Sequence, residues 1–543
     1  MVGEKVKSTM MHYPLTLNHI LERAGKLFGS TEIVSRLADR SLHRYTYRDF
    51  YRRSKQLAKA LQQAGLKRGD RVGTLMWNSY AHMECYFGIP VVGGVLHTLN
   101  LRLFPEDIGF IANHAEDRFI IVDDVLLPLF EKFKDKIKAE RVFVFSQSGK
   151  PAPSGYEDYE QFIASAQGIL QYPDIDENEA CGMCYTSGTT GQPKGVVYSH
   201  RSTVLHAFMA AMPDTSGYCN ADCALPVVPM FHANAWAIPY VCAMVGAKLV
   251  FPGPFLDGES LLELYEKEKV TVSAGVPTIW LSLLQTLQQN PGKWQLVPGM
   301  RMTVGGSAVP ASLIKAYAEL DMEIIQGWGM TETSPIATIS KLDQNTRKLP
   351  PDERAAAVAR QGVIVPFVDI RIMNDDGEAP WDGQSVGEVQ VRGPWITGGY
   401  HNLAKSEESF TADGWLKTGD VGLIGQDGYL RLTDRAKDLI KSGGEWISSV
   451  ELENSIMGHP AVAEAAVIAV PHPKWDERPL AVVVLKPGQT ASADEIREFL
   501  LGTYAKWQVP DGIVFVDAIP RTSTGKFLKT KLREDYKDWK WLS

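Results

Sequence analysis

The segment from Tyr185 to His200 has the sequence YTSGTTGQPKGVVYSH. Its glycines allow successive backbone N–H groups to converge on an anion, because no Cβ stands in the way. The hydroxyl groups of Ser187, Thr189 and Thr190 add hydrogen-bond donors. Lys194 adds a positive charge that suits phosphate. The segment therefore predicts a loop that holds a polyphosphate.

The P-loop of nucleotide hydrolases is the first alternative, and the spacing excludes it. That motif requires a second glycine directly before its lysine and Ser or Thr directly after it. Gly188 has the right distance from Lys194, but Pro193 and Gly195 occupy the two other positions. A flexible surface loop is the second alternative, and the ordered density of Gly, Ser and Thr disfavours it.

Length and composition predict a soluble globular protein with more than one domain. The chain of 543 residues is too long for a single core. Its hydrophobic fraction of 45% and charged fraction of 22% are ordinary. The net charge of −8 argues against nucleic acid as the main partner, because a phosphate backbone requires a basic surface.

No segment resembles a targeting or membrane-spanning sequence. The start, MVGEKVKSTMMHYPL, lacks the apolar core of a signal peptide. The longest uncharged apolar run, 235–247, contains Pro239 and is too short to span a bilayer. We therefore expect a cytoplasmic protein without an integral membrane segment.

The six cysteines include two closely spaced pairs, Cys181 with Cys184 and Cys219 with Cys223. Together the pairs could form a four-thiolate zinc site. However, Cys181 and Cys184 lie in a run typical of a strand, where they would point to opposite faces. We interpret the cysteines as small buried side chains and predict no metal site from them.

The first two thirds of the chain alternate helical and strand-like segments. Residues 47–64 have helical spacing, with apolar or small side chains every three or four positions. Short β-rich runs occur at 71–75, 119–122, 142–145, 247–251, 270–274 and 323–325. Apolar runs of this kind are typical of parallel strands buried on both faces. The alternation predicts an α/β fold with doubly wound sheets.

After Gly362 the pattern changes to short strands separated by turns. Strands are predicted at 368–372 and 387–391, with turn signals at 375–377, 413–414 and 427–428. We predict a small β-barrel-like subdomain here. The charged seam at 434–438 is the predicted domain boundary, which gives an N-terminal domain of residues 1–435 and a C-terminal domain of residues 436–543.

The C-terminal domain has the pattern of a compact α+β module. Helices are predicted at 449–457 and 493–504, and strands at 462–470 and 480–485.

A second glycine-containing segment, 326–333, has the sequence QGWGMTET. Gly327 and Gly329 let the chain pass close to a ligand, and Trp328 offers a flat ring for a purine. Glu332 is a carboxylate suited to Mg²⁺ beside phosphate oxygens. Taken alone, the segment also fits a packed turn.

Three further segments carry polar groups suited to a nucleotide. Asp420, in Thr-Gly-Asp, can accept two hydrogen bonds from a ribose diol, although Gly-Asp is also a common turn. A cluster with Arg435, Lys437 and Lys441 precedes the loop 442–446, and a solvated charge cluster is its alternative interpretation. Lys526, in PRTSTGKF, can offset charge where ATP meets a carboxylate, or simply face solvent.

Taken together, these segments resemble the adenylate-forming superfamily, which includes acyl-CoA synthetases, firefly luciferase and the adenylation domains of peptide synthetases. The resemblance covers essentially the whole chain, with the motifs in order. The segments VVPMFHANAW (227–236) and DLIKSGGEWISSVELEN (438–454) look like those of bacterial fatty acyl-CoA synthetases with medium or long chain preference. The resemblance implies that ATP, Mg²⁺, coenzyme A and a carboxylic acid bind, with a homodimer possible.

The resemblance also implies a role for each motif. The residues expected at ATP or AMP are Thr186, Ser187, Gly188, Thr189, Thr190, Gly191, Lys194, Gly306, Ser307, Gln326, Gly327, Trp328, Gly329, Asp420 and Arg435. The expected catalytic residues are His232, Thr331, Glu332 and Lys526. The acyl group is expected at Gly305, His232 and Trp236, and Mg²⁺ at Glu332 and Thr186. The coenzyme A side is expected at Lys441, Ser442, Gly443, Gly444, Glu445 and Trp446.

The implied reaction has two steps. A carboxylate attacks the α-phosphate of ATP to give acyl-adenylate and pyrophosphate, with Lys526 bridging the two anions. The thiol of coenzyme A then displaces AMP, after the C-terminal domain rotates about a hinge at Lys437. His232 and Trp236 keep an alternative interpretation as ordinary core residues.

The acid itself stays open at this stage. A fatty acid is the main prediction. A short or substituted acid, such as a methylthio-propionate, is one alternative. An acyl-AMP ligase that loads a carrier protein and a luciferase-like oxygenase are others. A non-catalytic lipid-binding relative is disfavoured, because Lys526, Glu332 and the phosphate loop are all present.

Overall fold

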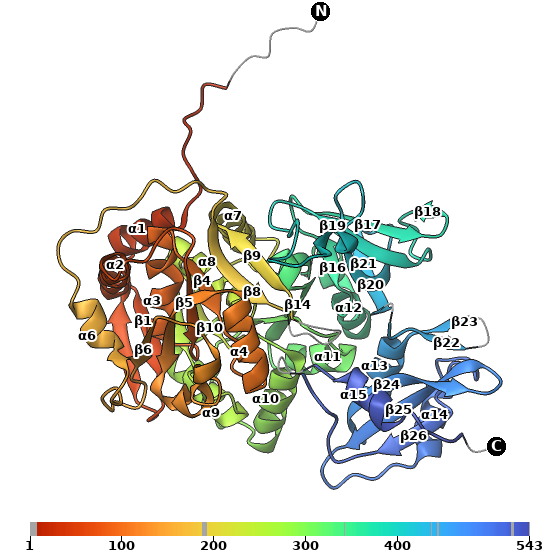
Figure 1. The fold of residues 1–543 in the computed structure, drawn as a ribbon. Helices are drawn as coiled ribbons and strands as arrows, with labels where there is room; N and C mark the ends of the chain where they lie inside the picture. The colour runs from red at the N-terminus through yellow and green to blue at the C-terminus, as the bar shows by residue number, and fades with distance from the viewer. Residues whose placement is uncertain are drawn as a thin grey trace, which may run out of the picture.

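Two large sheets form the N-terminal part of the protein, and a third sheet forms a smaller C-terminal domain (Figure 1). The computed structural model describes residues 8–186, 193–341, 343–435, 437–442, 445–522 and 526–541, with the backbone alone at 445 and 446.

The seven-stranded sheet carries the ends of the predicted phosphate loop. Its strands are β3 (Arg71–Leu75), β4 (Val95–Thr98), β5 (Asp117–Asp123), β6 (Arg141–Phe145), β7 (Glu157–Asp158), β8 (Ala180–Tyr185) and β9 (Gly195–Ser199). The order is β7-β6-β5-β3-β4-β8-β9, parallel except where β9 pairs antiparallel with β8. The loop therefore connects two adjacent strands at the edge of this sheet.

The fourteen-stranded sheet joins a first part that is parallel, apart from one antiparallel edge strand (β2 on β1), to a second part that is antiparallel. The first part contains β1 (Glu32–Arg36), β2 (Leu42–Thr46), β10 (Cys223–Pro226), β11 (Lys248–Phe251), β12 (Val272–Gly275), β13 (Met300–Val304) and β14 (Met322–Gly329). The second part contains β15 (Ile336–Ser340), β16 (Gly362–Ile364), β17 (Asp369–Asn374), β18 (Gly377–Glu378), β19 (Gly387–Arg392), β20 (Leu416–Ile424) and β21 (Tyr429–Arg435). The order is β18-β17-β19-β20-β21-β16-β15-β14-β13-β12-β10-β11-β1-β2.

The structure differs in one respect from the predicted β-barrel-like subdomain. The short strands after Gly362 are present, but they continue the large sheet instead of closing on themselves. The reason is that β15 pairs antiparallel with β14 on one side and with β16 on the other, which joins both parts by hydrogen bonds. Among the described strands, the path ends at β18 and β2.

Helices pack between and around these sheets, as the doubly wound α/β prediction requires. They are α1 (Leu17–Leu27), α2 (Tyr47–Gln63), α3 (Tyr80–Gly88), α4 (Pro105–His114), α5 (Leu127–Phe130), α6 (Tyr159–Ala164), α7 (His200–Ala211), α8 (Ile238–Val245), α9 (Gly258–Glu268), α10 (Pro277–Gln289), α11 (Ala311–Glu319) and α12 (Pro351–Val358). The main core cluster joins side chains of α1, α2, α3 and α8 to strands of both sheets. Burying apolar side chains in this layer fixes the two sheets relative to each other.

Local sequence explains where α2 begins. The side chain of Thr46 accepts a hydrogen bond from the backbone N–H of Asp49, whose carboxylate accepts one from the N–H of Thr46. This capping box satisfies N–H groups that a helix start leaves unpaired. The face predicted to be apolar, with Phe50, Leu57 and Leu61, is buried.

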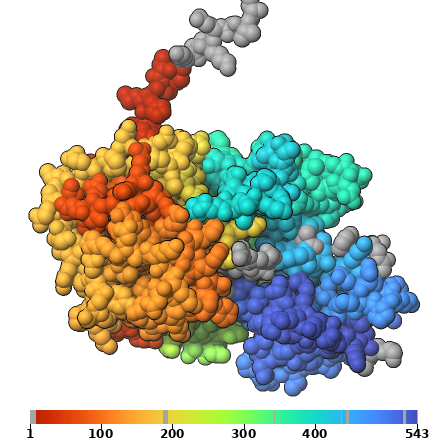
Figure 2. Space-filling view, in the orientation of Figure 1, coloured from red at the N-terminus to blue at the C-terminus, as the bar shows by residue number. Residues whose placement is uncertain are grey.

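The C-terminal domain is built on the third sheet, with strands β22 (Ile440–Ser442), β23 (Glu445–Ile447), β24 (Val462–His472), β25 (Asp476–Leu485) and β26 (Gly512–Phe515). Its helices are α13 (Ser449–Met457), α14 (Ala493–Leu501) and α15 (Lys529–Asp535). The domain lies beside both the main body and the antiparallel part of the large sheet (Figure 2). The predicted α+β module is confirmed.

The cysteines agree with their predicted role except at one position. All six are free, and five are buried, whereas Cys219 is exposed. Cys219 lies in a turn before β10, outside the apolar strand that buries Cys223.

Candidate active site

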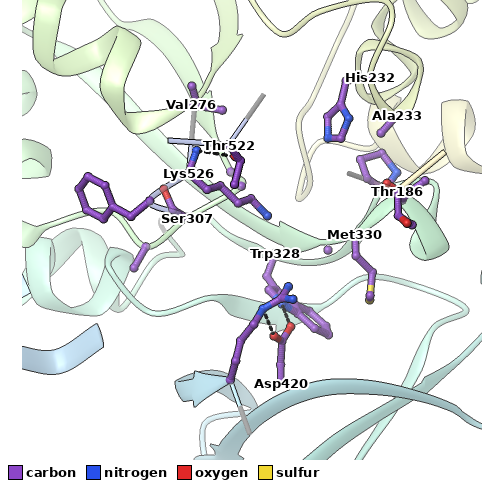
Figure 3. A pocket seen from close by; sticks show the side chains of 18 of the residues that line it. Thr186, His232, Ala233, Val276, Ser307, Trp328, Met330, Asp420, Thr522 and Lys526 are labelled. Carbon is purple, nitrogen blue, oxygen red and sulfur yellow. Dashed lines mark hydrogen bonds and ion pairs between the residues drawn. The ribbon is translucent and has the colours of Figure 1, made fainter. Parts of the chain in front are cut away.

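A cavity of about 960 Å³ lies where the main body, the antiparallel strands and the C-terminal domain meet. Figure 3 shows that its labelled lining side chains come from segments far apart in the sequence, from Thr186 to Lys526. Most described residues predicted at ATP or at the acyl group line it, which brings the separate motifs into one site.

One end of the cavity presents a ring and two charges suited to a nucleoside (Figure 3). Asp420 lies on β20 directly opposite Arg435 on β21, and their side chains form an ion pair of 3.1 Å. The other carboxylate oxygen of Asp420 accepts a hydrogen bond of 2.9 Å from Nε1 of Trp328. Because Asp420 is only 4% exposed, these partners keep a buried charge compensated and fix its position.

Glu332 lies in the short helical turn Thr331–Thr333 that follows β14. It is 6% exposed, and its Oε1 accepts a hydrogen bond of 2.8 Å from the hydroxyl of Tyr400. The backbone carbonyl of the neighbouring Thr331 accepts one from Tyr198 on β9. The ammonium of Lys194 lies 4.8 Å from the ring centroid of Tyr400. A carboxylate and a lysine are thus held close together at the phosphate end.

The ends of the predicted phosphate loop are joined by two hydrogen bonds. The backbone N–H of Thr186 donates to the carbonyl of Lys194 at 2.9 Å, and the N–H of Lys194 donates to the hydroxyl of Thr186 at 3.1 Å. Both residues line the cavity. The predicted site residues Ser187, Gly188, Thr189, Thr190 and Gly191 lie outside the described residues.

Lys526 reaches into the cavity from the C-terminal domain (Figure 3). The Cε atom of Lys526 lies 3.7 Å from the point where Gly306 would carry a Cβ, and φ of Gly306 is +90°. Burial lowers the pKa of Lys526 to about 8, with Arg435 adding to the decrease and Asp420 and Glu332 opposing it. The amine of Lys526 therefore lies beside Gly306 and close enough to Arg435, Asp420 and Glu332 to be influenced by their charges.

The part of the cavity predicted to take the acyl group, here called the acyl limb, includes apolar side chains of Val227, Phe231, Leu256, Val276, Ile279, Leu281 and Pro310. His232 also lines the cavity. Burial, followed by the charges of Lys526 and Arg102, lowers the pKa of His232 to about 4. The imidazole is neutral at pH 7, so it can orient a carboxylate by hydrogen bonding without adding a charge.

Trp236 packs against Gly305, the glycine predicted at the acyl group. A Cβ added at Gly305 would lie 3.1 Å from the indole of Trp236 and 3.1 Å from the carbonyl oxygen of Gly327. Glycine at 305 is therefore what allows the indole to approach the end of β13 so closely.

The segment that carries Trp236 has an unusual backbone. Residues Ala233 to Ala237 all have positive φ, from 43° to 62°. This conformation costs roughly 1–2 kcal/mol for each L-residue. The side-chain Oδ1 of Asn234 holds the turn by accepting a hydrogen bond of 3.2 Å from the thiol of Cys184. Asn78 binds the backbone just before the turn through Pro226, Val228 and Met230.

Sequence reasoning missed several residues that line the cavity, namely Arg102, His114, Tyr400 and His401. The pair Tyr400-His401 follows two glycines, in GGYHN, which was a signal of a close backbone approach. Arg102 lies just before α4, and His114 is the last residue of that helix. No feature of the surrounding sequence indicated that either residue lines a cavity.

The residues predicted on the coenzyme A side are not part of this cavity. Lys441 and Ser442 lie on β22, where Ser442 accepts a hydrogen bond from Arg478. Neither is among the described residues that line the cavity. Gly443 and Gly444 lie outside the described residues, and Glu445 and Trp446 have only their backbone described, in β23. Lys437, the predicted hinge, does line the cavity.

The described ranges contain no group of three or more His, Cys, Asp or Glu side chains arranged to hold a metal ion. No helix within them has both the length and the apolar character needed to cross a membrane.

Known proteins resemble the chain over nearly its whole length. The family model described as AMP-binding enzyme matches residues 21–401, and the AMP-binding enzyme C-terminal domain matches residues 451–526. A long-chain-fatty-acid–CoA ligase of Thermus thermophilus is 48% identical over 545 residues, which cover 99% of each chain. A 3-methylmercaptopropionyl-CoA ligase of Ruegeria lacuscaerulensis is 44% identical over 535 residues, covering 97% of this chain and 98% of the relative.

A solved structure has the same overall arrangement. The crystal structure of an anthranilate CoA ligase in complex with anthranoyl-AMP has a TM-score of 0.86 and 27% sequence identity, with 97% of this chain and 98% of that chain covered.

Proposed function

This chain belongs to the AMP-binding enzyme family, and we propose that it is an AMP-forming fatty acid–CoA ligase. The observation that carries the proposal is the position of Lys526, inside the cavity between the Trp328–Asp420 end and the apolar limb. A cation at that point lies where a carboxylate from one limb would meet a nucleotide phosphate from the other.

In the first step, the carboxylate oxygen forms a bond to the α-phosphorus of ATP, and the bond to the leaving pyrophosphate breaks. Such a displacement depends on positioning and on charge neutralisation. Trp328 would stack on the adenine, and Asp420 with Arg435 would bind the ribose hydroxyls. Lys526 would contact both the carboxylate and the α-phosphate.

The phosphate end is suited to Mg²⁺. Glu332 uses Oε1 to accept from Tyr400, which leaves its other oxygen for a cation. Mg²⁺ is often held by one carboxylate together with substrate phosphates and water. Glu332 would hold the ion, and the Thr186 hydroxyl, which already accepts from Lys194, would lie at the same end. When bound, the ion would neutralise the phosphates.

The second step requires a different arrangement, because the thiol of coenzyme A must reach the acyl carbon of the adenylate. The sulfur forms a bond to that carbon, and AMP leaves. We propose that residues 1–435 and 436–543 act as two domains, and that the second rotates about Lys437. Lys441 and the loop 442–446 would then face the site that Lys526 vacates, through a hinge motion between two states.

A fatty acid is the proposed substrate, because apolar side chains line the acyl limb and the Thermus thermophilus relative has that substrate in its name. A short, sulfur-containing acid is the second candidate, favoured by the similarity to a 3-methylmercaptopropionyl-CoA ligase. An acyl-AMP ligase that loads a carrier protein is a third, since the first step is the same.

The experiment that tests the proposal is pyrophosphate release with a panel of short, medium, long and methylthio-substituted acids, with and without coenzyme A. We expect the specificity constant to rise with chain length, by up to about tenfold for each methylene that fits the limb. Acyl-CoA should form only when coenzyme A is present. A preference for the methylthio acid selects the second candidate, and adenylate without thioester selects the third.

We further propose that the enzyme acts in the cytoplasm as a homodimer. Cell fractionation and light scattering of the purified protein test these two points.

A further inference from the structure

Two histidines that lie outside the motifs described above flank the phosphate loop. His114 is the last residue of α4, and His401 lies in the connection between β19 and β20, in the sequence Gly-Gly-Tyr-His. Both line the cavity, together with Thr186, Pro193 and Lys194. Their ring centroids are 5.8 Å apart, with the planes at 88°.

Each histidine is fixed to one end of the loop. Nδ1 of His114 lies 2.7 Å from the hydroxyl of Tyr185, which directly precedes Thr186. The backbone N–H of His401 donates to the carbonyl of Gly195, which directly follows Lys194, at 2.9 Å. A Cβ at Gly195 would lie 2.9 Å from the ring of Tyr185 and 3.2 Å from Cβ of His401. The two side chains therefore pack tightly against both ends of the loop.

We propose that His114 and His401 form an anion-binding pair that holds the pyrophosphate group as it leaves ATP. The proposal rests on the proposed function and extends it to residues that no motif identified. The ligand class is a diphosphate, bound jointly by the two imidazoles and Lys194.

The charges around the pair favour an anion that arrives from the cavity. Arg71, from β3, contacts the carbonyl of Ala115 and the carboxylate of Glu116. Glu116 is the nearby acid, and it is 71% exposed at the side chain. Tyr400 and Lys194 line the cavity with the pair, and Tyr185 contacts His114. Behind Tyr185 lie His97 and Asp117, which are buried and hydrogen-bonded to each other at 2.8 Å. Arg71 and Lys194 are the nearby cations, and Glu116 is turned toward solvent.

Proton binding should couple to pyrophosphate binding. Burial, with Arg71 and His114, lowers the pKa of His401, so the empty site favours the neutral imidazole. A polyphosphate nearby favours the charged form and raises the pKa. Nε2 of His401 lies 3.1 Å from Nδ2 of Asn402, whose amide can turn to present its oxygen to a protonated ring. Affinity for pyrophosphate should therefore fall as pH rises.

The test uses the full-length protein in ATP–pyrophosphate exchange, across a pH series, with His114→Gln, His401→Gln and Tyr185→Phe. We expect both histidine variants to raise KM for pyrophosphate by about tenfold at neutral pH, with KM for the acid unchanged. The variants should also lose part of the pH dependence of that KM. Tyr185→Phe, which removes a hydrogen bond but keeps both imidazoles, should change it less than about threefold.

His12→Gln is the matched control, because His12 is exposed on the N-terminal segment. The inference is overturned if the histidine variants keep the KM of the unsubstituted protein at every pH, or if Tyr185→Phe reproduces their whole effect. Calorimetric titration of Mg-pyrophosphate gives an independent dissociation constant. This constant should increase only in the histidine variants. Absence of exchange in the unsubstituted protein would reject the proposed function, whereas equal binding constants reject the histidine pair.

Discussion

Lys526 combines two properties that oppose each other, a charge and a buried position. Taking an ammonium out of water disfavours the charged form, and the nearby Arg435 adds to that effect. Asp420 and Glu332 act in the other direction. ATP would bring further negative charge to this point. The charged form of Lys526 is therefore fully stabilised only when the negatively charged substrates are bound. This property suits a group that neutralises charge in a transition state.

Removal of the Lys526 amine should separate the two half-reactions. Lys526→Ala is expected to slow acyl-adenylate formation by about a hundredfold or more, because a preorganised charge in a buried site contributes strongly to the rate. Thioester formation from supplied acyl-adenylate should be largely kept. Pyrophosphate exchange and thioester assays measure the two steps, with Lys531→Ala on the exposed face of α15 as the control. Equal loss of both steps would reject the assignment.

The same lysine predicts a pH dependence. The charged form is required, and burial lowers the pKa of Lys526 to about 8 in the free enzyme. The value of kcat/KM for adenylation should therefore be constant below that pH and fall about tenfold per unit above it. Arginine stays protonated throughout this range. In Lys526→Arg the rate should be lower, and the decline above pH about 8 should vanish. A decline at the same pH would assign it to another group.

At the scale of elements, the left-handed turn Ala233–Ala237 positions the acyl end. Its backbone conformation is unfavourable for alanine, asparagine and tryptophan, so the surrounding contacts must impose it. Asn78 and Cys184 supply such contacts from the seven-stranded sheet region. The turn places Trp236 against Gly305, which follows β13 of the other large sheet. The acyl limb is therefore shaped by both sheets together.

Substitution at Gly305 tests this packing. In Gly305→Ala the new Cβ meets the indole of Trp236 and the carbonyl oxygen of Gly327, each at 3.1 Å. The backbone cannot give way easily, so the indole must move into the limb. We expect kcat/KM for long acids to fall by about tenfold, with KM for ATP little changed. An equal loss for short and long acids would show that the ring does not shape the limb. Gly502→Ala, at an exposed position with φ −65° where the added Cβ meets nothing closer than 3.4 Å, controls for general effects of the added methyl group.

The sequence predicted the polar part of the site better than its apolar part. Trp328, Asp420 and Arg435 were predicted because each lies in a motif with distinctive residue types, and their strands bring them together. The turn at Ala233–Ala237 was not predictable, since alanine favours right-handed helix and nothing local signals positive φ. Tyr400 was missed for a similar reason, because its bond to Glu332 depends on two segments far apart in the chain.

At the scale of the whole molecule, the C-terminal domain holds Lys526 in the cavity while Lys441 lies on a strand outside it. In the proposed mechanism, the adenylate-forming step uses this arrangement. The thioester-forming step would use another, because Lys526 occupies the position that the thiol is proposed to approach. The connection between the two domains, at Lys437, is therefore the place where the proposed rotation can be blocked.

Proline at the hinge should block the rotation and leave the first step intact. Lys437→Pro fixes φ of that residue. Pyrophosphate exchange should stay within about threefold of the unsubstituted protein, whereas thioester formation should slow by about tenfold or more. Lys437→Ala is the matched variant, because it removes the side chain but leaves the backbone free. If alanine and proline have the same effect on thioester formation, the backbone rotation is not located at this residue.

The central claim is that a carboxylate attacks the α-phosphate of ATP in this cavity. Isotope transfer from a fatty acid labelled with ¹⁸O in its carboxyl group tests it most directly, with the products of a complete reaction identified by mass spectrometry. We expect acyl-CoA, pyrophosphate and AMP in equal amounts, with AMP carrying a single labelled oxygen. Unlabelled AMP, or ADP with phosphate, would contradict it.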